Sequence, residues 1–268
     1  MQIPVLNEPF VSFAGSIPRL FDALGAADVL AGQRRILIKP NLVNPSPPPV
    51  TLPLEAAAAL VDYCQQHTTA PVIIAEGTGE PDVTTWDVFK AHGYDTLADQ
   101  KGVELMDLND ADLVKLSHPE CRVFPTFMMP EVVMNSYVIS AATLKVHSLA
   151  RVTLSMKNLI GVAPPAYYQR GGYWRKSAFH HQMQTSVFEL NRYRQPDLAF
   201  IDGSVGLADH HLRGPCCDPP VRTLLAGFDP VAVDARGAEL LGIPWQQVGH
   251  IKMADGILGR AESIEKPS

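Results

Sequence analysis

The sequence contains few cysteines, no excess of positive charge and no long apolar run. Its 4 cysteines, Cys64, Cys121, Cys216 and Cys217, include no CxxC pair, so neither a disulfide framework nor a ferredoxin-type cluster held by this chain alone is expected. Lys and Arg number 22 against 28 Asp and Glu, which argues against a general surface for nucleic acid or anionic membranes. No run approaches the roughly 20 apolar residues that span a bilayer, and no secretory leader pattern is present. We therefore expect a cytoplasmic protein with no nucleic-acid or membrane partner.

Short apolar runs alternate with helix-like stretches along the 268 residues. Most of these runs are apolar throughout, as strands are when helices cover both faces of their sheet. The predicted strands are residues 35–39, 71–76, 102–106, 136–140, 143–147, 197–202 and 221–226. The predicted helices are residues 53–67, 84–92, 151–160, 177–193 and 230–241. This order predicts a single α/β domain over residues 1–268, with a parallel or mixed sheet, βα crossovers and helices on both faces.

Two loops have an unusual composition. Residues 44–53 are rich in proline and predict a stiff surface loop, which could be a connector or a lid. Residues 163–174 combine prolines, a Gly-Gly pair and four aromatic residues. That composition predicts a movable loop that covers a ligand with flat side chains.

Polar residues directly after the strands are the candidates for a site, because ligands of open α/β sheets bind beyond the carboxyl ends of the strands. Lys39 and Asn41 lie at the end of the first predicted strand and could bind a carboxylate or phosphate, and the alternative is a capped turn with a solvated lysine. Glu76 ends the second and precedes a glycine turn, where it could be a base, a metal ligand or the partner of a lysine. Neither GxGxxG nor GxxxxGK(S/T) occurs at this junction, so no nucleotide is predicted there.

The densest polar cluster begins at Lys145. Lys145 and His147 share one face of a strand, because strand side chains alternate with a period of two. On the predicted helix that follows, Thr153 and Lys157 share a face and Asn158 lies beside it. Two lysines and a histidine from consecutive elements predict an anion site, and the alternative is a set of solvated lysines with a histidine bound to a carboxylate.

Carboxylates follow the later strands. Asp202 ends one of them, and Asp229 is expected to cap a helix whose first residue is Pro230. Asp234, one turn further, could line a pocket or begin a solvated helix face.

A transition-metal site is a further candidate in the loop that contains His210, His211, Cys216 and Cys217. Imidazole and thiolate are suitable ligands, but the spacing matches no standard zinc pattern. The adjacent pair at 180 and 181 is expected to lie on a helix, exposed or packed, with the two imidazoles facing different directions.

Six phrases resemble, in order and spacing, the family of a domain of unknown function called DUF362. They are ILIKPNL (36–42), IAEGTG (74–79), LKVH (144–147), VTLSMKNLIG (152–161), PDLAFIDG (196–203) and DPVAVD (229–234). The resemblance implies that the recurring family positions are Lys39, Asn41, Glu76, Lys145, His147, Lys157, Asn158, Asp202, Asp229 and Asp234. Many members carry or adjoin ferredoxin modules, which implies a redox link. Because this chain lacks the ferredoxin cysteines, electron transfer would need a separate ferredoxin-like partner.

These observations predict an enzyme of undetermined class that acts on a small carboxylate or phosphate by proton transfer, isomerisation or reduction. The expected catalytic residues are Lys145, His147, Glu76 and Lys157. The expected substrate-binding residues are Lys39, Asn41, Asn158, Asp202 and Asp234.

Two alternatives remain open on the sequence. One is a metal- or metallocluster-dependent redox protein, with ligands from Glu76, His147, Asp202 and Asp234 or from the His210/Cys216 loop. The other is a noncatalytic ligand-binding module that works with a redox partner. The sequence identifies no cofactor.

Overall fold

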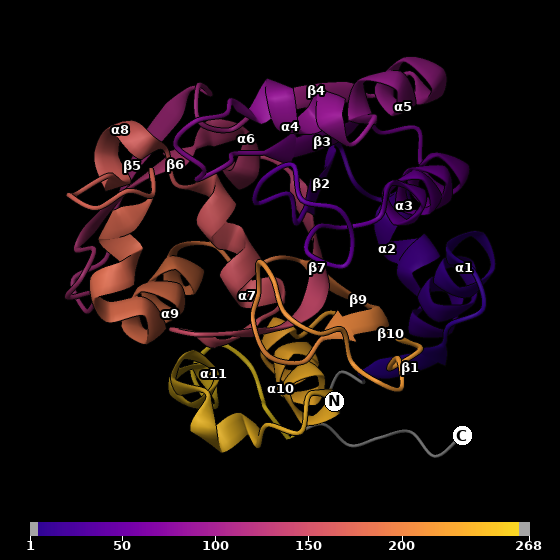
Figure 1. Cartoon of the computed structure of the whole chain (residues 1–268). Helices are drawn as coiled ribbons and strands as arrows, with labels where there is room; N and C mark the ends of the chain where they lie inside the picture. The colour runs from indigo at the N-terminus through magenta and orange to yellow at the C-terminus, as the bar shows by residue number, and fades with distance from the viewer. Residues whose placement is uncertain (1–4, 263–268) are drawn as a thin grey trace.

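The computed structural model describes residues 5–262, and its main sheet has 8 strands in the order β1-β10-β9-β7-β2-β3-β4, with β8 paired to β7 (Figure 1). The pairs along β9, β7, β2, β3 and β4 are parallel, whereas β1, β10 and β8 pair antiparallel. The strands are β1 (Leu6–Pro9), β2 (Ile36–Pro40), β3 (Val72–Glu76), β4 (Glu104–Asp107), β7 (Tyr137–His147), β8 (Arg151–Thr153), β9 (Leu198–Leu207) and β10 (Thr223–Gly227). The sheet is therefore mixed and mostly parallel, which confirms the predicted α/β class.

Helices surround this sheet, and a second, two-stranded antiparallel sheet consists of β5 (Leu113–Ser117) and β6 (Thr126–Pro130). The α-helices are α1 (Phe13–Leu24), α2 (Ala26–Ala31), α3 (Leu54–His67), α4 (Thr85–Ala91), α5 (Tyr94–Lys101), α6 (Glu131–Met134), α7 (Ser155–Asn158), α8 (Pro165–Tyr168), α9 (Met183–Tyr193), α10 (Pro230–Leu240) and α11 (Gly249–Ala254). The 3-10 helices are η1 (Leu159–Val162), η2 (Ser177–Gln182) and η3 (Trp245–Gln247).

Both faces of the central strands are buried, which explains why their sequences do not alternate. Ile36 and Ile38 of β2 pack with α1 and α3 on one face, whereas Leu37 packs with β6 and α9 on the other. Each connection between two parallel strands crosses one face of the sheet, so these strands run in the same direction and end at the same edge of the sheet. The carboxyl ends of β2, β3 and β7 therefore lie side by side.

Two predicted boundaries were wrong around β7. The runs at 136–140 and 143–147 form one strand, β7, rather than two. The helix predicted over 151–160 is instead β8, then α7 and η1. Arg151 adopts a positive φ of 69°, and β8 pairs back onto β7 with Lys145 opposite Thr153. The apolar residues at 152, 154 and 156 fit a period of two as well as a helix, so only the pairing with β7 decided between them.

Helix ends follow the expected local chemistry. The Asp229 side chain accepts hydrogen bonds from the backbone N–H groups of Val231 and Ala232, with Pro230 in the first turn of α10. This confirms the predicted cap. The segment predicted as a helix over 177–193 begins as the 3-10 helix η2 and becomes regular in α9. No helix within residues 5–262 combines the length and apolar character needed to cross a bilayer.

Candidate functional site

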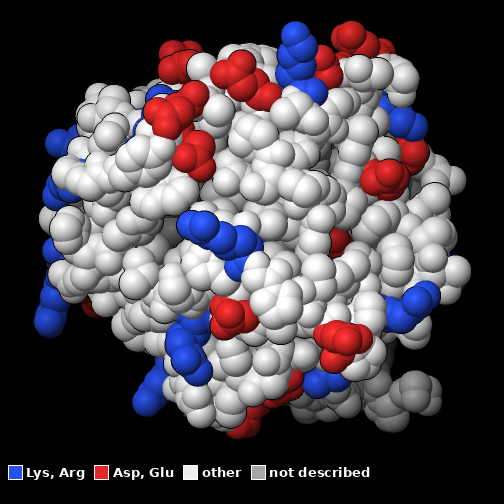
Figure 2. Space-filling model, viewed as in Figure 1, with Lys and Arg blue, Asp and Glu red and all other residues white. Residues whose placement is uncertain are grey.

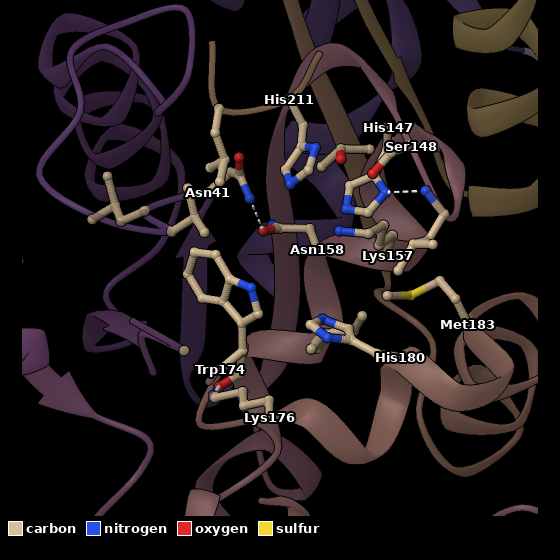
Figure 3. Close-up of a pocket in the computed structure, with 18 of the residues that line it drawn as sticks. Asn41, His147, Ser148, Lys157, Asn158, Trp174, Lys176, His180, Met183 and His211 are labelled. Carbon is tan, nitrogen blue, oxygen red and sulfur yellow. Dashed lines mark hydrogen bonds between the residues drawn. The ribbon is translucent and has the colours of Figure 1, made fainter. Parts of the chain in front are cut away.

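A cavity of about 390 Å³ lies at the carboxyl ends of β2, β3 and β7 (Figure 3). Its wall contains most of the predicted site residues, namely Lys39, Asn41, Glu76, His147, Lys157 and Asn158. Lys145, Asp202 and Asp234 do not line it. The cavity thus collects side chains from three neighbouring strand ends, as expected for an open α/β sheet.

The Lys39 ammonium and the Glu76 carboxylate form a buried ion pair, with Nζ 2.8 Å from Oε1 and 2.9 Å from Oε2. Both side chains are almost fully buried, at 1% and 3% exposure. The carboxylate also accepts from the backbone N–H groups of Leu42 and Gly77. Burial lowers the pKa of Lys39, and the Glu76 charge opposes that shift. All of these bonds hold Glu76 as a fixed counter-ion, which leaves it poorly suited to accept a substrate proton.

Two asparagines connect this pair to Lys145. The Asn158 carbonyl accepts from Lys39 Nζ at 3.2 Å and from Asn41 Nδ2 at 3.0 Å. The Asn41 carbonyl accepts in turn from Lys145 Nζ at 2.6 Å, and Lys145 also donates to the backbone carbonyl of Val50 at 2.5 Å. Desolvation, followed by the nearby charge of Lys157, lowers the pKa of Lys145 well below its ordinary value. Lys145 is therefore enclosed by the proline-rich loop and does not reach the cavity.

Lys157 differs from these lysines because its ammonium makes no hydrogen bond or ion pair with any residue in the described range 5–262. Its side chain is partly exposed and lines the cavity beside Asn158 (Figure 3). Desolvation, with a contribution from the charge of Lys39, lowers its pKa to about 8. Lys157 is thus a cavity-lining lysine whose pKa is lowered towards neutral, although the protonated form still predominates at pH 7.

Asp234 fixes the position of α7, the short helix that contains Lys157. Its carboxylate accepts from the backbone N–H of Ser155 at 2.8 Å, the Ser155 hydroxyl at 2.6 Å and the backbone N–H of Met156 at 3.0 Å. Asp234 has 0% exposure, and desolvation raises its pKa to about 7. It therefore anchors the start of α7 instead of lining a pocket or beginning a solvated face.

Asp202 is also buried, and its carboxylate accepts a hydrogen bond from the backbone N–H of Ser204.

His147 lines the cavity, and its tautomer follows from the backbone around it. Nδ1 accepts from the backbone N–H groups of Leu149 and Ala150, each at 3.1 Å, so it carries no proton. Desolvation, then the charge of Lys157, lowers the pKa of His147 strongly. The ring is therefore neutral with its proton on Nε2, which is the nitrogen that faces the cavity side (Figure 3). A neutral imidazole of this kind is a hydrogen-bond donor and cannot act as a base through Nδ1.

His211 stacks on His147 with ring centroids 3.8 Å apart, and His210 stacks on His211 at 4.6 Å. Both belong to the loop that precedes Cys216, and both line the cavity. The Nδ1 atom of His211 is buried with no hydrogen-bond partner among the described residues, and so is Oγ1 of Thr153. Buried polar atoms are normally paired, so these two atoms are exceptions, but both are enclosed and neither is exposed at the cavity surface.

The structure does not assemble either predicted set of metal ligands. In residues 5–262, no group of three or more His, Cys, Asp or Glu side chains is arranged to hold a metal ion. Glu76 is bound to Lys39, Asp234 to α7, and the histidine rings of the loop stack on one another. Cys216 is exposed and does not line the cavity.

The sequence did not indicate several residues of the wall as site residues, and Lys176 and His180 are two of them. Lys176 donates to the backbone carbonyls of Gly77 at 2.6 Å and Gly161 at 2.7 Å, and burial lowers its pKa to about 7. His180 lies at the exposed rim of the cavity, on η2. Nothing in the spacing around Lys176 distinguishes it from a surface lysine, because the strand-end rule does not reach a residue at the start of a 3-10 helix.

The aromatic loop predicted as a lid contributes one ring to the cavity. Trp174 lines it (Figure 3). Tyr168 is instead part of the core, where it stacks on Phe127 with centroids 4.6 Å apart. Tyr173 is exposed and hydrogen-bonds Asp82. We expected several aromatic side chains of this loop to cover a ligand, but Trp174 is the one that lines the cavity, because Tyr168 on α8 packs into the core.

The outer surface carries no long basic stripe on the face seen in Figure 2, where Lys and Arg are scattered among Asp and Glu.

A family model described as "Domain of unknown function (DUF362)" matches residues 36–239. No curated protein shows a significant match to the chain. The family match covers most of the chain and includes every predicted site residue, so the protein belongs to the DUF362 family.

Proposed function

We propose that the protein is an enzyme that binds a small anion, a carboxylate or a phosphate, in this cavity and transfers a proton at the bound molecule. The observation that carries the proposal is the ammonium of Lys157, which has no hydrogen-bond or ion-pair partner within residues 5–262. Glu76 is the one carboxylate among the described residues that line the cavity, and it is neutralised by Lys39. The wall therefore has positive charge without an internal counter-ion, and an anionic ligand would supply one.

The proposed roles follow from the hydrogen bonds already made. Lys157 attracts the anion while protonated and accepts a proton once it is neutral, since its pKa of about 8 makes both forms accessible. His147 donates its Nε2 proton in a hydrogen bond to an oxygen on which negative charge develops. Glu76 and Lys39 keep the strand ends in place and take no proton. Isomerisation by proton transfer needs no second substrate, whereas reduction would need a separate electron donor of the ferredoxin kind.

Binding of inorganic phosphate and of oxalate tests the proposal, by calorimetry and by the rise in melting temperature. We expect both anions to bind the unsubstituted protein, and Lys157→Ala to weaken binding at least about tenfold because a partly desolvated charge contact is worth more than about 1.4 kcal/mol. Lys115→Ala is the matched control, since Lys115 is an exposed lysine on β5. Equal binding by Lys157→Ala, or no binding by the unsubstituted protein, would contradict the proposal.

A further inference from the structure

The four lysines around the cavity differ in what their amines already bind. Lys39 is held by Glu76, and Lys145 by Asn41 and a backbone carbonyl. Lys176 donates to two backbone carbonyls. A new covalent bond at any of these amines would break bonds that hold buried groups together. Lys157 has no such partner in the described part of the chain, so a substituent on its Nζ displaces nothing.

The surroundings of Lys157 are also those of a nucleophilic amine. It lies in a partly dry cavity beside other cationic groups, which is how proteins keep a lysine amine unprotonated and reactive towards carbonyl carbon. His147 presents a fixed N–H donor next to it, suited to a carbonyl oxygen as negative charge develops there. The cavity thus combines a lysine amine that has no partner among the described residues with a hydrogen-bond donor for the carbonyl oxygen that the amine would displace.

We propose that Lys157 forms an imine with the carbonyl carbon of a 2-oxo acid, an inference that rests on the proposed function. The lysine nitrogen bonds to the carbonyl carbon, and the carbonyl electron pair moves to oxygen, giving a carbinolamine. The carbon–oxygen bond then breaks, and the oxygen leaves as water with two of the three protons of the original ammonium. The product is a protonated imine with the same single positive charge, so charge and atoms balance with no further reactant.

The other walls of the cavity define the substrate class. The 2-oxo acid carboxylate is attracted by the surplus of positive charge, since Glu76 is already paired. Ile160, Trp174 and Met183 supply an apolar and aromatic part of the wall. A 2-oxo acid with a bulky apolar or aromatic side chain therefore fits better than one with a methyl group. The imine would draw electrons from the adjacent carbon and make its C–H bond acidic, which agrees with proton transfer as the reaction.

Borohydride trapping tests the imine directly. The folded full-length protein is incubated with phenylpyruvate or pyruvate, reduced with sodium borohydride, and digested for peptide mapping by mass spectrometry. We expect one reduced adduct per chain, on Lys157, and half-labelling at a lower concentration of phenylpyruvate than of pyruvate. An adduct on Lys176 or spread over surface lysines, or no adduct at saturating 2-oxo acid, would overturn the assignment. A preference for pyruvate would overturn the assignment of the apolar side chain.

Lys157→Arg separates this inference from the proposed function. Arginine keeps the positive charge but forms no imine under these conditions, so the variant should give no trapped adduct while binding inorganic phosphate more tightly than Lys157→Gln does. Lys157→Gln, with a folded state checked by circular dichroism, should lose both. If the unsubstituted protein binds phosphate but is never trapped, the imine is wrong and anion binding stands. If it neither binds phosphate nor is trapped, both proposals fail.

Discussion

The ammonium of Lys39 lies 2.8 Å and 2.9 Å from the two carboxylate oxygens of Glu76, across the neighbouring ends of β2 and β3. Both residues line the cavity, and the backbone of Gly161 packs closely against them. A buried pair of this kind is costly to desolvate but more costly to break, because the remaining charge has no counter-ion. We therefore expect the pair to govern the stability of the site, whereas anion binding is assigned in our proposal to Lys157, whose ammonium has no partner among residues 5–262.

Removing one member of this pair should destabilise the protein more than removing both. We expect Lys39→Met to lower the free energy of unfolding by about 3 kcal/mol, because it leaves a buried carboxylate. The double variant Lys39→Met/Glu76→Gln should lose about 2 kcal/mol less, since the neutral amide needs no counter-ion. Urea denaturation followed by tryptophan fluorescence measures both. A double variant less stable than the single one would show that the pair is not the source of the loss.

Gly161 should tolerate no side chain. A Cβ at this position would lie against the Glu76 carboxylate and the Lys39 ammonium, closer than real contacts allow. We expect Gly161→Ala to lower the free energy of unfolding by about 3 kcal/mol, since it must separate the buried pair. Gly32→Ala is the control, because a Cβ there meets only the backbone oxygen of Val29 at 3.8 Å. Thermal unfolding compares the two, and similar melting temperatures would rule out the predicted clash.

Lys157→Met should stabilise the protein while removing anion binding. Desolvation disfavours the charged lysine in the folded state, as its lowered pKa shows, and methionine fills a similar volume without that cost. Because the side chain is partly exposed, we expect a gain of only about 1 kcal/mol in the free energy of unfolding. Lys115→Met on exposed β5 should change it by less than about 0.5 kcal/mol. A destabilised Lys157→Met protein would mean that the ammonium has a partner in the folded state.

Anion affinity should fall as pH rises. A lysine is cationic below its pKa, and the pKa values of Lys157 and Lys176 are lowered to about 8 and about 7. His147 stays neutral over this range because its pKa is strongly lowered, and Glu76 remains paired with Lys39. Sulfate is a suitable probe because its own charge is constant from pH 6 to pH 9. We expect its affinity to drop about tenfold over that range, measured by calorimetry.

Lys157→Arg provides the control for this pH dependence, since the guanidinium does not titrate below pH 9. Its sulfate affinity should fall less between pH 7.5 and 9 than that of the unsubstituted protein. If the sulfate affinity of the two proteins depended on pH in the same way, the titrating group would be a residue other than Lys157.

Much of the architecture could be predicted from local pattern. The continuous apolar runs of β2 and β3 indicated strands buried on both faces, and the rule for open α/β sheets led from their ends to Lys39 and Glu76. The Asp229 cap and the proline that follows it could also be predicted from the sequence, because a helix cap depends on neighbouring residues. The secondary structure after His147 could not be predicted, since the spacing of its apolar residues fits a strand and a helix alike.

The sequence by itself determined which polar residues lie at the edge of the sheet, because strand periodicity and parallel connections place them there with little freedom. Only the tertiary structure decided what each of them does. Lys39 and Lys157 are chemically identical side chains, but one meets a carboxylate 37 residues away in sequence and the other meets none among the described residues. Likewise, two backbone N–H groups decided the tautomer of His147. Pairing, burial and protonation depend on distances between segments far apart in the chain, and local sequence patterns do not contain those distances.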